Sequence, residues 1–328
     1  MHATSAALAT QAQQAWLRFR AAFEPLRPEL YRYCRHLTSS PWDAEDLVQD
    51  ALMRALVTLG SQYGHEIREP RAWLFRVASN AWIDRVRRTR DEHSGSVEEQ
   101  LEASGAQQPA DPRPARAAAS ALISRLSPQE RVALVLKDAF DLSLEEIAAT
   151  LATSVGAVKA ALHRGRGKLE ADAPAPARVP VPAAIDAFCA AFNAGDLQAL
   201  TKTLLEAATI ELPGVSIDLG VEASLDHTSG ILYHSLLTPL SSGVPPRFLE
   251  GYVPAPPRAE LREHRGEPIL LLWYAHTDGE AVRSFYRFTI DPTTGQIARL
   301  IEYYYSPEAL AEVAGELGVP VRSNGYGM

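Results

Sequence analysis

Basic side chains in the first half of the chain gather in two short clusters. They are Arg85, Arg87, Arg88 and Arg90, and then Lys159, Arg164, Arg166 and Lys168. Clustered cations attract phosphate groups even where the total charge of a region cancels. Cations at a helix C-terminus also compensate the helix dipole, so the first cluster has a purely structural interpretation as well. The chemistry that both clusters favour is binding of a nucleic-acid backbone.

The second cluster lies on a helix that two helix-start signals precede. Ser127-Pro128-Gln129-Glu130 and Ser143-Leu144-Glu145-Glu146 both have the capping-box pattern. A short helix through Leu151, a turn at 152–154 and a further helix to Leu169 then predict a helix-turn-helix. Such a helix fits the major groove. Its outward positions include Gly156, Ala157, Lys159, Ala160, His163, Arg164 and Gly167. The alternative is an ordinary three-helix unit with a solvated basic face.

A helix with one apolar and one polar face is expected from Ser40 to about Leu59. Ser40 can cap it, and Pro41 suits the first turn. Its apolar positions recur with helical spacing from Leu47 onward. The opposite face carries Glu45, Asp46, Gln49, Asp50 and Arg54. That face is either solvated or a docking surface for a partner.

Composition and charge limit the classes of protein that this chain can belong to. The 328 residues are 46% hydrophobic and carry a net charge of -8. Residues 1–172 contain 22 basic and 22 acidic side chains, whereas 173–328 contain 10 and 18, so the acidic excess lies in the second half. Two cysteines without ligand spacing predict neither disulfides nor a metal site, and no cofactor is expected. No stretch suits a signal peptide or membrane span, which favours the cytoplasm.

Two linkers divide the chain into three folded parts. One is polar and covers 91–116, and the other is rich in alanine and proline and covers 172–182. The helical parts are 15–90 and 117–171. The third part, 183–317, begins with helices and continues as strands at 209–212, 247–253, 259–264, 269–276, 282–290 and 297–305.

The third part offers polar residues that could line a pocket. The candidates are His227, Tyr233, Trp273, His276 and Tyr286. A proton-transfer enzyme would need a carboxylate and a partner that converge there, and the sequence shows no convergence. A lone histidine is more often structural than catalytic. We therefore expect no catalytic residues and no enzyme activity.

Taken together, the motifs of the two helical parts closely resemble regions 2 and 4 of the extracytoplasmic-function (ECF) sigma factors. Region 2 is matched by Asp43-Ala44-Glu45-Asp46-Leu47-Val48-Gln49-Asp50 and by Arg71-Ala72-Trp73-Leu74-Phe75-Arg76-Val77-Ala78-Ser79-Asn80. Region 4 is matched by the segments that begin at Leu126, Leu142 and Ser154. The resemblance covers roughly residues 20–170.

This resemblance implies a transcription initiation subunit that binds core RNA polymerase and promoter DNA. Asp46, Gln49, Asp50 and Arg54 would dock on the polymerase. Region 2 would hold the minus-10 element through Tyr63, His65, Asn80, Arg85, Arg87 and Arg88. Region 4 would read the minus-35 element through Ser154, Lys159, His163, Arg164 and Arg166, with Arg164 suited to guanine edges. Tyr63 could equally be an aromatic that anchors its own loop.

The segment Ala191-Phe192-Asn193-Ala194-Gly195-Asp196-Leu197 resembles the SnoaL-like group of the nuclear-transport-factor-two superfold. The resemblance implies an α+β cone with a curved antiparallel sheet after two all-α sigma domains, a region 2 bundle and a region 4 helix-turn-helix. Such a domain would contact the sigma domains within the chain and modulate them. No anti-sigma partner is identified. The alternative is a helix-turn-helix regulator whose third part senses a small molecule or is an enzyme.

Overall fold

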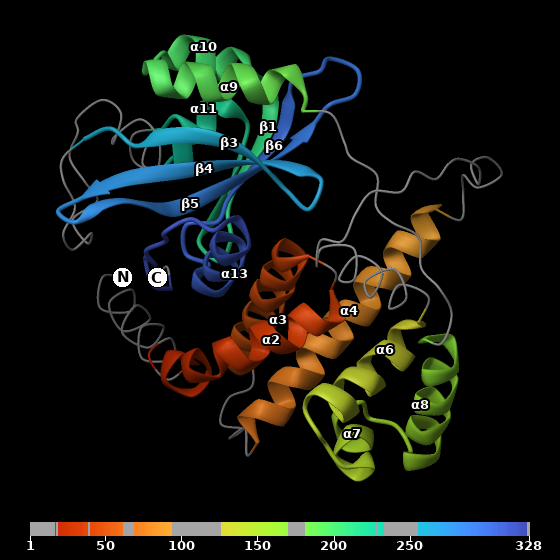
Figure 1. Ribbon diagram of the computed structural model, residues 1–328. Helices are drawn as coiled ribbons and strands as arrows, with labels where there is room; N and C mark the ends of the chain where they lie inside the picture. The colour runs from red at the N-terminus through yellow and green to blue at the C-terminus, as the bar shows by residue number, and fades with distance from the viewer. Residues whose placement is uncertain are drawn as a thin grey trace, which may run out of the picture. The chain divides into compact units, whose positions relative to one another are not determined.

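The computed structural model (Figure 1) describes residues 17, 19–38, 40–61, 69–93, 126–169, 181–226, 229–232 and 255–326. The chain divides into two compact units, Met1–Pro176 and Ala177–Met328. Because the described residues run only to 93 and resume at 126, the expected linker at 91–116 lies largely outside them. So do most of the linker at 172–182 and the strand expected at 247–253.

The first unit begins with a bundle of helices. A short 3-10 helix η1, Glu24–Leu26, leads into α2, Arg27–Leu37, which is followed by α3, Pro41–Ser61, and α4, Pro70–His93. Ser40 caps α3 as predicted, since its Oγ accepts a hydrogen bond from the backbone N–H of Trp42 at 3.2 Å. The three long helices pack against one another. Their shared core includes Leu30, Leu37, Trp42, Leu47 and Leu74.

Polar and aromatic contacts fix the packing of α2 against its neighbours. The Arg27 guanidinium of α2 donates to the Glu45 carboxylate of α3, and both side chains are buried. The ring of Tyr33 stacks on that of Phe75 with centroids 4.6 Å apart, and its hydroxyl lies 2.6 Å from the Ser79 hydroxyl. A buried polar group is tolerated where it has a partner, and these pairs tie α2 to both α3 and α4.

The helix-turn-helix is built as the sequence predicts. Helix α6 spans Pro128–Leu134, the π-helical turn η2 spans Val135–Ala139, α7 spans Leu144–Thr150 and α8 spans Val155–Leu169. Both capping boxes form: Ser127 and Glu130 bond reciprocally, and Ser143 and Glu146 do the same. Helix α8 packs on α6 and on α7.

The second unit combines helices with one mixed sheet. Its helices are α9, Ala183–Ala194, α10, Leu197–Lys202, α11, Val221–Ser224, and α13, Pro307–Leu317. Its strands are β1, Leu204–Leu212, β2, Ser216–Leu219, β3, Arg258–His264, β4, Glu267–His276, β5, Gly279–Ile290, and β6, Ile297–Glu302. In the sheet, the strands lie in the order β2-β1-β6-β5-β4-β3.

The sheet is antiparallel except where β1, the strand next to the β2 edge, pairs with β6 in parallel. Three pairings contain register shifts, for example between Leu272 and Trp273 on β4. Such irregularities bend and twist strands, which is how a sheet acquires curvature. Helix α9 covers one face through Phe188 and Phe192, which join the main apolar core, and α13 packs against β5 on the opposite face (Figure 1).

The C-terminal segment, whose role the sequence leaves open, completes the edge of β5. The Pro320 carbonyl accepts from the Val282 N–H at 2.9 Å, and the Arg322 N–H donates to the Val282 carbonyl at 2.9 Å. Asn324 then donates to the carbonyls of Arg283 and Tyr304 at 2.7 and 2.8 Å. These bonds satisfy backbone groups that strand β5 would otherwise expose.

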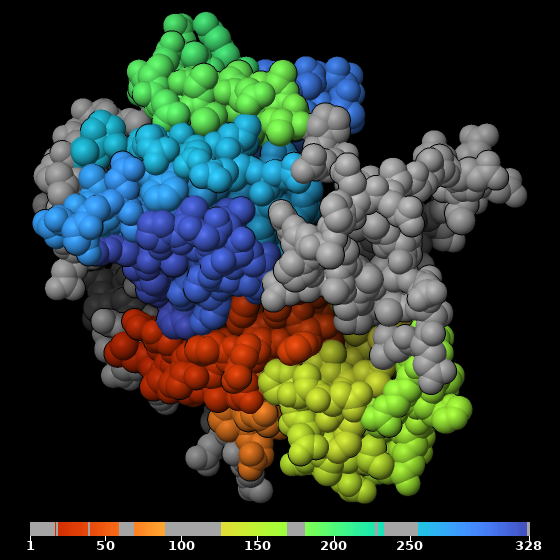
Figure 2. Space-filling model, viewed as in Figure 1, coloured from red at the N-terminus to blue at the C-terminus, as the bar shows by residue number. Residues whose placement is uncertain are grey.

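The predicted fold class is confirmed: all-α parts are followed by an α+β part with a curved sheet. The parallel β1–β6 pair is a detail that the expected antiparallel meander lacked. Strand β2 and helix α13 were not predicted, and β6 ends at Glu302 rather than at Tyr305. In space-filling representation, the green atoms of α9 lie against the neighbouring cyan strand β3 (Figure 2).

Candidate nucleic-acid interface and pocket

The polar face of α3 is more structured than its sequence suggests. The expectation that Glu45 lies on the outer face is wrong, because Glu45 is fully buried and pairs with Arg27. Gln49 donates to Glu45 at 2.7 Å and so supports this pair. Asp46 and Asp50 are half-buried, and Arg54 is exposed. Two exposed apolar side chains, Met53 and Val57, lie on the same helix.

Helix α4 presents part of the expected minus-10 surface. Asn80, Arg87 and Arg88 are exposed on it. Arg85 instead donates to Asp50 of α3 at 3.0 Å, so a residue predicted to bind DNA is paired with one predicted to bind the polymerase. The other two predicted residues, Tyr63 and His65, lie outside the described residues.

Arg76 is a basic residue of α4 that the sequence reasoning did not select. It lies one helical turn before Asn80 and is half-buried. Arg87 follows Asn80 by about two turns, so the three side chains share one side of the helix. The four-residue spacing of Arg76 and Asn80 is visible in the sequence and could have indicated that Arg76 lies beside Asn80. We add Arg76 to the candidate minus-10 residues on this basis.

Helix α8 separates the predicted minus-35 residues into two groups. Lys159 and His163 are exposed, and neither makes an ion pair that the structure describes. Arg164 donates to Glu130 at 3.2 Å, and Arg166 donates to Asp138 at 2.7 Å. Ser154 accepts a hydrogen bond from the Ala157 N–H at 3.2 Å and so caps the helix. Arg164 and Arg166 therefore position α8 on α6 and η2, whatever they contact in DNA.

The Glu130 carboxylate is the anchor of this positioning. It receives Lys168 Nζ at 2.8 Å as well as Arg164, and it accepts from the Ser127 N–H at 2.8 Å. Burial by itself would raise the pKa of Glu130, but the bonds from Lys168, Ser127 and Arg164 lower it to about 2. The charged form of Glu130 thus joins the start of α6 to the end of α8.

Lowering the pH should therefore reduce the stability of the first unit, because the Glu130 carboxylate becomes protonated. A carboxyl whose pKa is lowered on folding stabilises the fold above its unfolded pKa of about 4.3, and this stabilisation is lost as the pH falls toward 2. We expect the urea concentration at the midpoint of unfolding of the first unit to decrease as the pH is lowered from 5 to 3. The decrease should be smaller in Glu130→Gln. Tryptophan fluorescence measures it, because four of the five tryptophans lie in this unit.

Glu146 provides the matched control for this titration. It occupies the same capping-box position in α7, and hydrogen bonds from Ser143 lower its pKa. It is exposed, and other elements act on it only through the charges of Arg71 and Lys137. Glu146→Gln should leave the pH dependence close to that of the natural protein. Equal responses of the two variants would contradict the role given to Glu130.

Gly165 allows α8 to approach α6 closely. A Cβ atom at this position would lie 2.7 Å from Leu134 Cδ1 and 3.3 Å from Leu134 Cγ, whereas one at Gly167 would meet nothing within 4 Å. We expect Gly165→Ala to lower the free energy of unfolding by about 1–3 kcal/mol relative to Gly167→Ala, because the buried Leu134 side chain must leave its position or α8 must shift. Urea unfolding of both variants measures the difference. Equal stabilities would show that Leu134 gives way without cost.

The described candidate pocket residues of the second unit do not form one cavity. Tyr286 is fully buried in the main apolar core, and burial followed by the nearby Glu302 raises its pKa. It pairs with Leu270, six residues from His276 on β4, which corresponds to about 20 Å along the strand. Trp273 packs under Arg258, whose Cζ lies 5.1 Å from its ring. His227 and Tyr233 lie outside the described residues.

His276 belongs to a structural cluster. Arg283 Nε donates to its Nε2 at 2.8 Å, and the same guanidinium donates to Asn324 Oδ1 at 2.9 Å. Burial and then the charge of Arg283 lower the pKa of His276, which favours the neutral ring that this bond requires. The cluster connects β4 and β5 with the C-terminal segment rather than lining a cavity.

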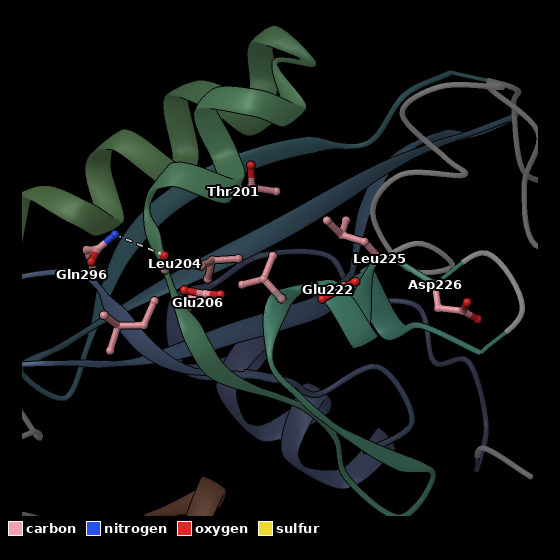
Figure 3. A pocket seen from close by; sticks show the side chains of 9 residues that line it. Thr201, Leu204, Glu206, Glu222, Leu225, Asp226 and Gln296 are labelled. Atoms are coloured by element: carbon pink, nitrogen blue, oxygen red, sulfur yellow. Dashed lines mark hydrogen bonds between the residues drawn. The ribbon is translucent and has the colours of Figure 1, made fainter.

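A cleft among the described residues of the second unit lies elsewhere, between α10, β1 and α11 (Figure 3). It encloses about 900 Å³, and its lining residues are Thr201, Leu204, Leu205, Glu206, Val221, Glu222, Leu225, Asp226 and Gln296. None of the pocket residues predicted from the sequence is among them. Apolar side chains and three carboxyl groups line a wide opening.

No three or more His, Cys, Asp or Glu side chains among the described residues are placed to hold a metal ion. No helix in the described part of the chain combines the length and apolar character that a membrane span requires.

The chain matches two known sequence families within the first unit. Residues 22–92 match Sigma-70 region 2, and residues 116–169 match Sigma-70 region 4. The ECF RNA polymerase sigma factor SigG of Mycobacterium tuberculosis is 32% identical over 228 residues, which are 60% of this chain and 61% of that protein. The chain thus spans about three fifths of the length of this relative.

A shorter relative is covered more completely. SigW of Bacillus subtilis is 31% identical over 157 residues, which cover 44% of this chain and 82% of SigW. Among solved structures, the ECF sigma factor SigJ of Mycobacterium tuberculosis aligns over 88% of this chain and 97% of its own, with 23% identity and a TM-score of 0.30. With two helical modules that match regions 2 and 4 in order, this chain belongs to the extracytoplasmic-function sigma factors of RNA polymerase.

Proposed function

We propose that the chain binds core RNA polymerase and directs it to promoters, and that its second unit modulates this activity in cis. The proposed parts are region 2 at 15–90, a linker at 91–116, region 4 at 117–171, a linker at 172–182 and a regulatory domain at 183–317. In this role the chain itself neither makes nor breaks a covalent bond. Because it would act on chromosomal promoters, its proposed location is the cytoplasm. The observation that carries the proposal is the ordered match to Sigma-70 regions 2 and 4.

The outer face of α3 is the proposed docking surface for the polymerase. Asp46, Asp50 and Arg54 supply charge, and Gln49 supplies an amide. Met53 and Val57 add exposed apolar area at 52% and 63% exposure. Apolar side chains surrounded by polar ones are typical of protein interfaces. The ion pairs Arg85–Asp50 and Arg54–Asp84 connect this surface with α4. They therefore hold the helix proposed to dock on the polymerase against the helix proposed to bind DNA.

DNA binding is assigned to the exposed cations and amides of α4 and α8. Arg76, Asn80, Arg87 and Arg88 of α4 would hold the minus-10 element together with Tyr63 and His65. In α8, Lys159 and His163 are exposed without a described ion pair, which suits contacts to phosphates and bases. Arg164 and Arg166 would bind DNA only in competition with Glu130 and Asp138.

Regulation by the second unit rests on charge. Residues 173–328 carry 18 acidic and 10 basic side chains, so they should attract a surface built to bind phosphate. A chain truncated at residue 172 is expected to differ from the full chain in transcription or in affinity for core polymerase. Identical behaviour of the two would remove the second unit from the proposal.

Run-off transcription with purified core polymerase tests the function as a whole. The full chain is expected to produce a defined transcript from its own promoter region, while core polymerase alone produces none. Scrambling the minus-35 or the minus-10 element should abolish the product. Failure to co-elute with core polymerase would overturn the proposal. It would favour a plain helix-turn-helix regulator, which binds DNA unaided but has no use for a Sigma-70 region 2 segment.

A further inference from the structure

Strand β2 forms one edge of the sheet in the second unit, and its exposed side chains are apolar. The strand order ends with β2, which pairs with β1 alone among the described strands. Ile217 and Leu219 are 59% and 76% exposed on it, and Val215 at the preceding turn is 50% exposed. An open strand edge with apolar side chains is a template for pairing with another strand.

The opposite edge of the same sheet is protected in two ways. Strand β3 lies against α9 (Figure 1), and Asn193 of α9 bonds the N–H and the carbonyl of Ala259 at 2.7 and 2.8 Å. The charged side chains of β3 form ion pairs, which join Arg258, Glu260 and Arg262. A covering helix and charged side chains both prevent strand pairing. Strand β2 differs, because its single charged residue, Asp218, is bonded to the Ile231 N–H at 2.6 Å.

The register of β2 on β1 shows which of its backbone groups face outward. The Gly220 N–H donates to the Ala208 carbonyl at 2.9 Å, in register with the pairs of β2 and β1. In an antiparallel pair, residues that exchange hydrogen bonds with the neighbouring strand alternate with residues whose N–H and C=O point away from it. Gly220 and Asp218 belong to the bonded set. Ile217 and Leu219 therefore direct their N–H and C=O groups away from β1, at the open edge.

Two copies of this edge can pair antiparallel about a two-fold axis at Ile217. The two Ile217 residues then exchange hydrogen bonds between N–H and C=O, and each Leu219 lies beside Val215 of the other copy. The exposed apolar side chains of one copy thereby cover those of the other. Apolar pairs that face each other across two strands stabilise the pairing.

Charge selects this axis over the neighbouring one. An axis at Asp218 would place two carboxylates directly opposite each other, which is unfavourable. An axis at Ile217 places each Asp218 opposite Ser216 of the other copy, whose hydroxyl can donate to a carboxylate. Glu211, which lies opposite Ile217 on β1, is paired with Arg299 of β6. The edge therefore matches a second copy of itself in apolar side chains, in backbone groups and in charge.

We propose that the second unit self-associates through antiparallel pairing of β2 with β2 of a second chain, which joins two six-stranded sheets into one. The strand has four residues, so we expect the interface to be smaller than the roughly 1,200 Å² that stable interfaces bury. The dimer should accordingly be weak, with a dissociation constant of about 10–100 μM. The proposal rests on the fold of the second unit and is independent of the proposed function.

Sedimentation velocity on the full chain between about 5 and 200 μM tests self-association. The average mass should rise toward that of a dimer as the concentration increases. In Ile217→Lys, two cations would face each other across the axis, so the dissociation constant should rise at least about tenfold. Val181→Lys is the matched control, because it also replaces an exposed apolar side chain but precedes α9, which packs on the opposite edge. This variant should dimerise as the natural protein does.

A mixture of Ile217→Lys and Ile217→Glu tests the axis itself. Each variant alone should remain monomeric over this range, whereas the mixture should form a heterodimer, because opposite charges then meet across the axis. Ile217 is exposed in the single chain, so both variants should keep the melting temperature of the natural protein. Folded variants that fail to associate when mixed would overturn the proposed pairing.

Cysteine substitutions test the register. The Cα atoms of a hydrogen-bonded pair lie about 5.5 Å apart, a separation that a disulfide can span. Ile217→Cys should therefore form a covalent dimer on mild oxidation, in a chain where Cys189 is replaced by serine and buried Cys34 is retained. Leu219→Cys is the control. Because each Leu219 lies opposite Val215, its two copies would be about 13 Å apart along the strands and should not cross-link.

Three results decide the proposal and keep it separate from the proposed function. A chain that stays monomeric at about 200 μM would overturn the pairing and leave the edge to a different partner. A dimer that Ile217→Lys leaves unchanged would also overturn it, since association would then use another surface. A dimer that forms as expected in a chain that never binds core polymerase would refute the proposed function and support the β2 pairing.

Discussion

Replacing Arg27 with methionine is expected to lower the free energy of unfolding of the first unit by about 3–5 kcal/mol. The change removes the guanidinium that Glu45 binds in the interior, where both side chains are buried. Removing one partner of a buried ion pair leaves a charge in a medium that solvates it poorly, and this cost exceeds what the pair gained on forming. Urea unfolding followed by tryptophan fluorescence measures the loss.

Arg20→Met is the matched control for this change. Arg20 pairs with Glu24 one turn away at 2.8 Å, but the two side chains keep 38% and 32% of their accessible surface, against 5% and 0% for Arg27 and Glu45. Exposed pairs contribute little, so this variant should unfold almost as the natural protein does. Gln49→Ala should have an intermediate effect, because Gln49 also donates to Glu45. A small effect of Arg27→Met would mean that Gln49 and water compensate the carboxylate.

Lys159→Glu is expected to reduce run-off transcription about tenfold, a change of about 1.4 kcal/mol in the binding step. Lys159 is exposed on the outward side of α8 and makes no ion pair in the described structure, so its charge is available to a phosphate. Reversal replaces an attraction with a repulsion at the same place. In Lys159→Ala, binding should weaken across sequences, and the dependence of log affinity on log salt should fall by about one.

Lys202→Glu controls for the change in net charge. Lys202 is also exposed but ends α10 in the second unit, outside both proposed DNA-binding helices. This variant should transcribe normally at every salt concentration. The melting temperature of Lys159→Glu should equal that of the natural protein, because no contact within the fold is lost. Normal transcription by Lys159→Glu would remove α8 from promoter binding, since Lys159 and His163 are the exposed basic side chains of α8 for which the structure describes no ion pair.

Helix starts show which features short-range chemistry can predict. The capping boxes at Ser127 and Ser143 and the cap at Ser40 all form as the sequence predicts. In each case the side chain bonds a backbone group two or three residues away, so the partner is already present in the local sequence. The helical spacing of apolar residues from Leu47 likewise identifies the buried side of α3. Local signals were therefore sufficient for the starts of α3, α6 and α7 and for the buried side of α3.

Local sequence patterns do not predict strand β2 or the parallel β1–β6 pair. Strand β2 has only four residues, and its Ile217 and Leu219 remain exposed at the sheet edge. Strand β6 pairs with β1 from about 90 residues earlier in the chain, as in Leu204 opposite Ile297. Neither pattern has a signature in neighbouring residues, because the pairing partner is set by the fold.

The sequence by itself determined the helical modules, their order and the family to which the chain belongs. Only the tertiary structure decided which charged side chains are available to a partner. Glu45 is buried with Arg27 from another helix, and Arg164 and Arg166 are bound to Glu130 and Asp138, respectively 34 and 28 residues away. A charge is free or neutralised according to what the fold brings within about 4 Å, and periodicity along one helix does not contain that information.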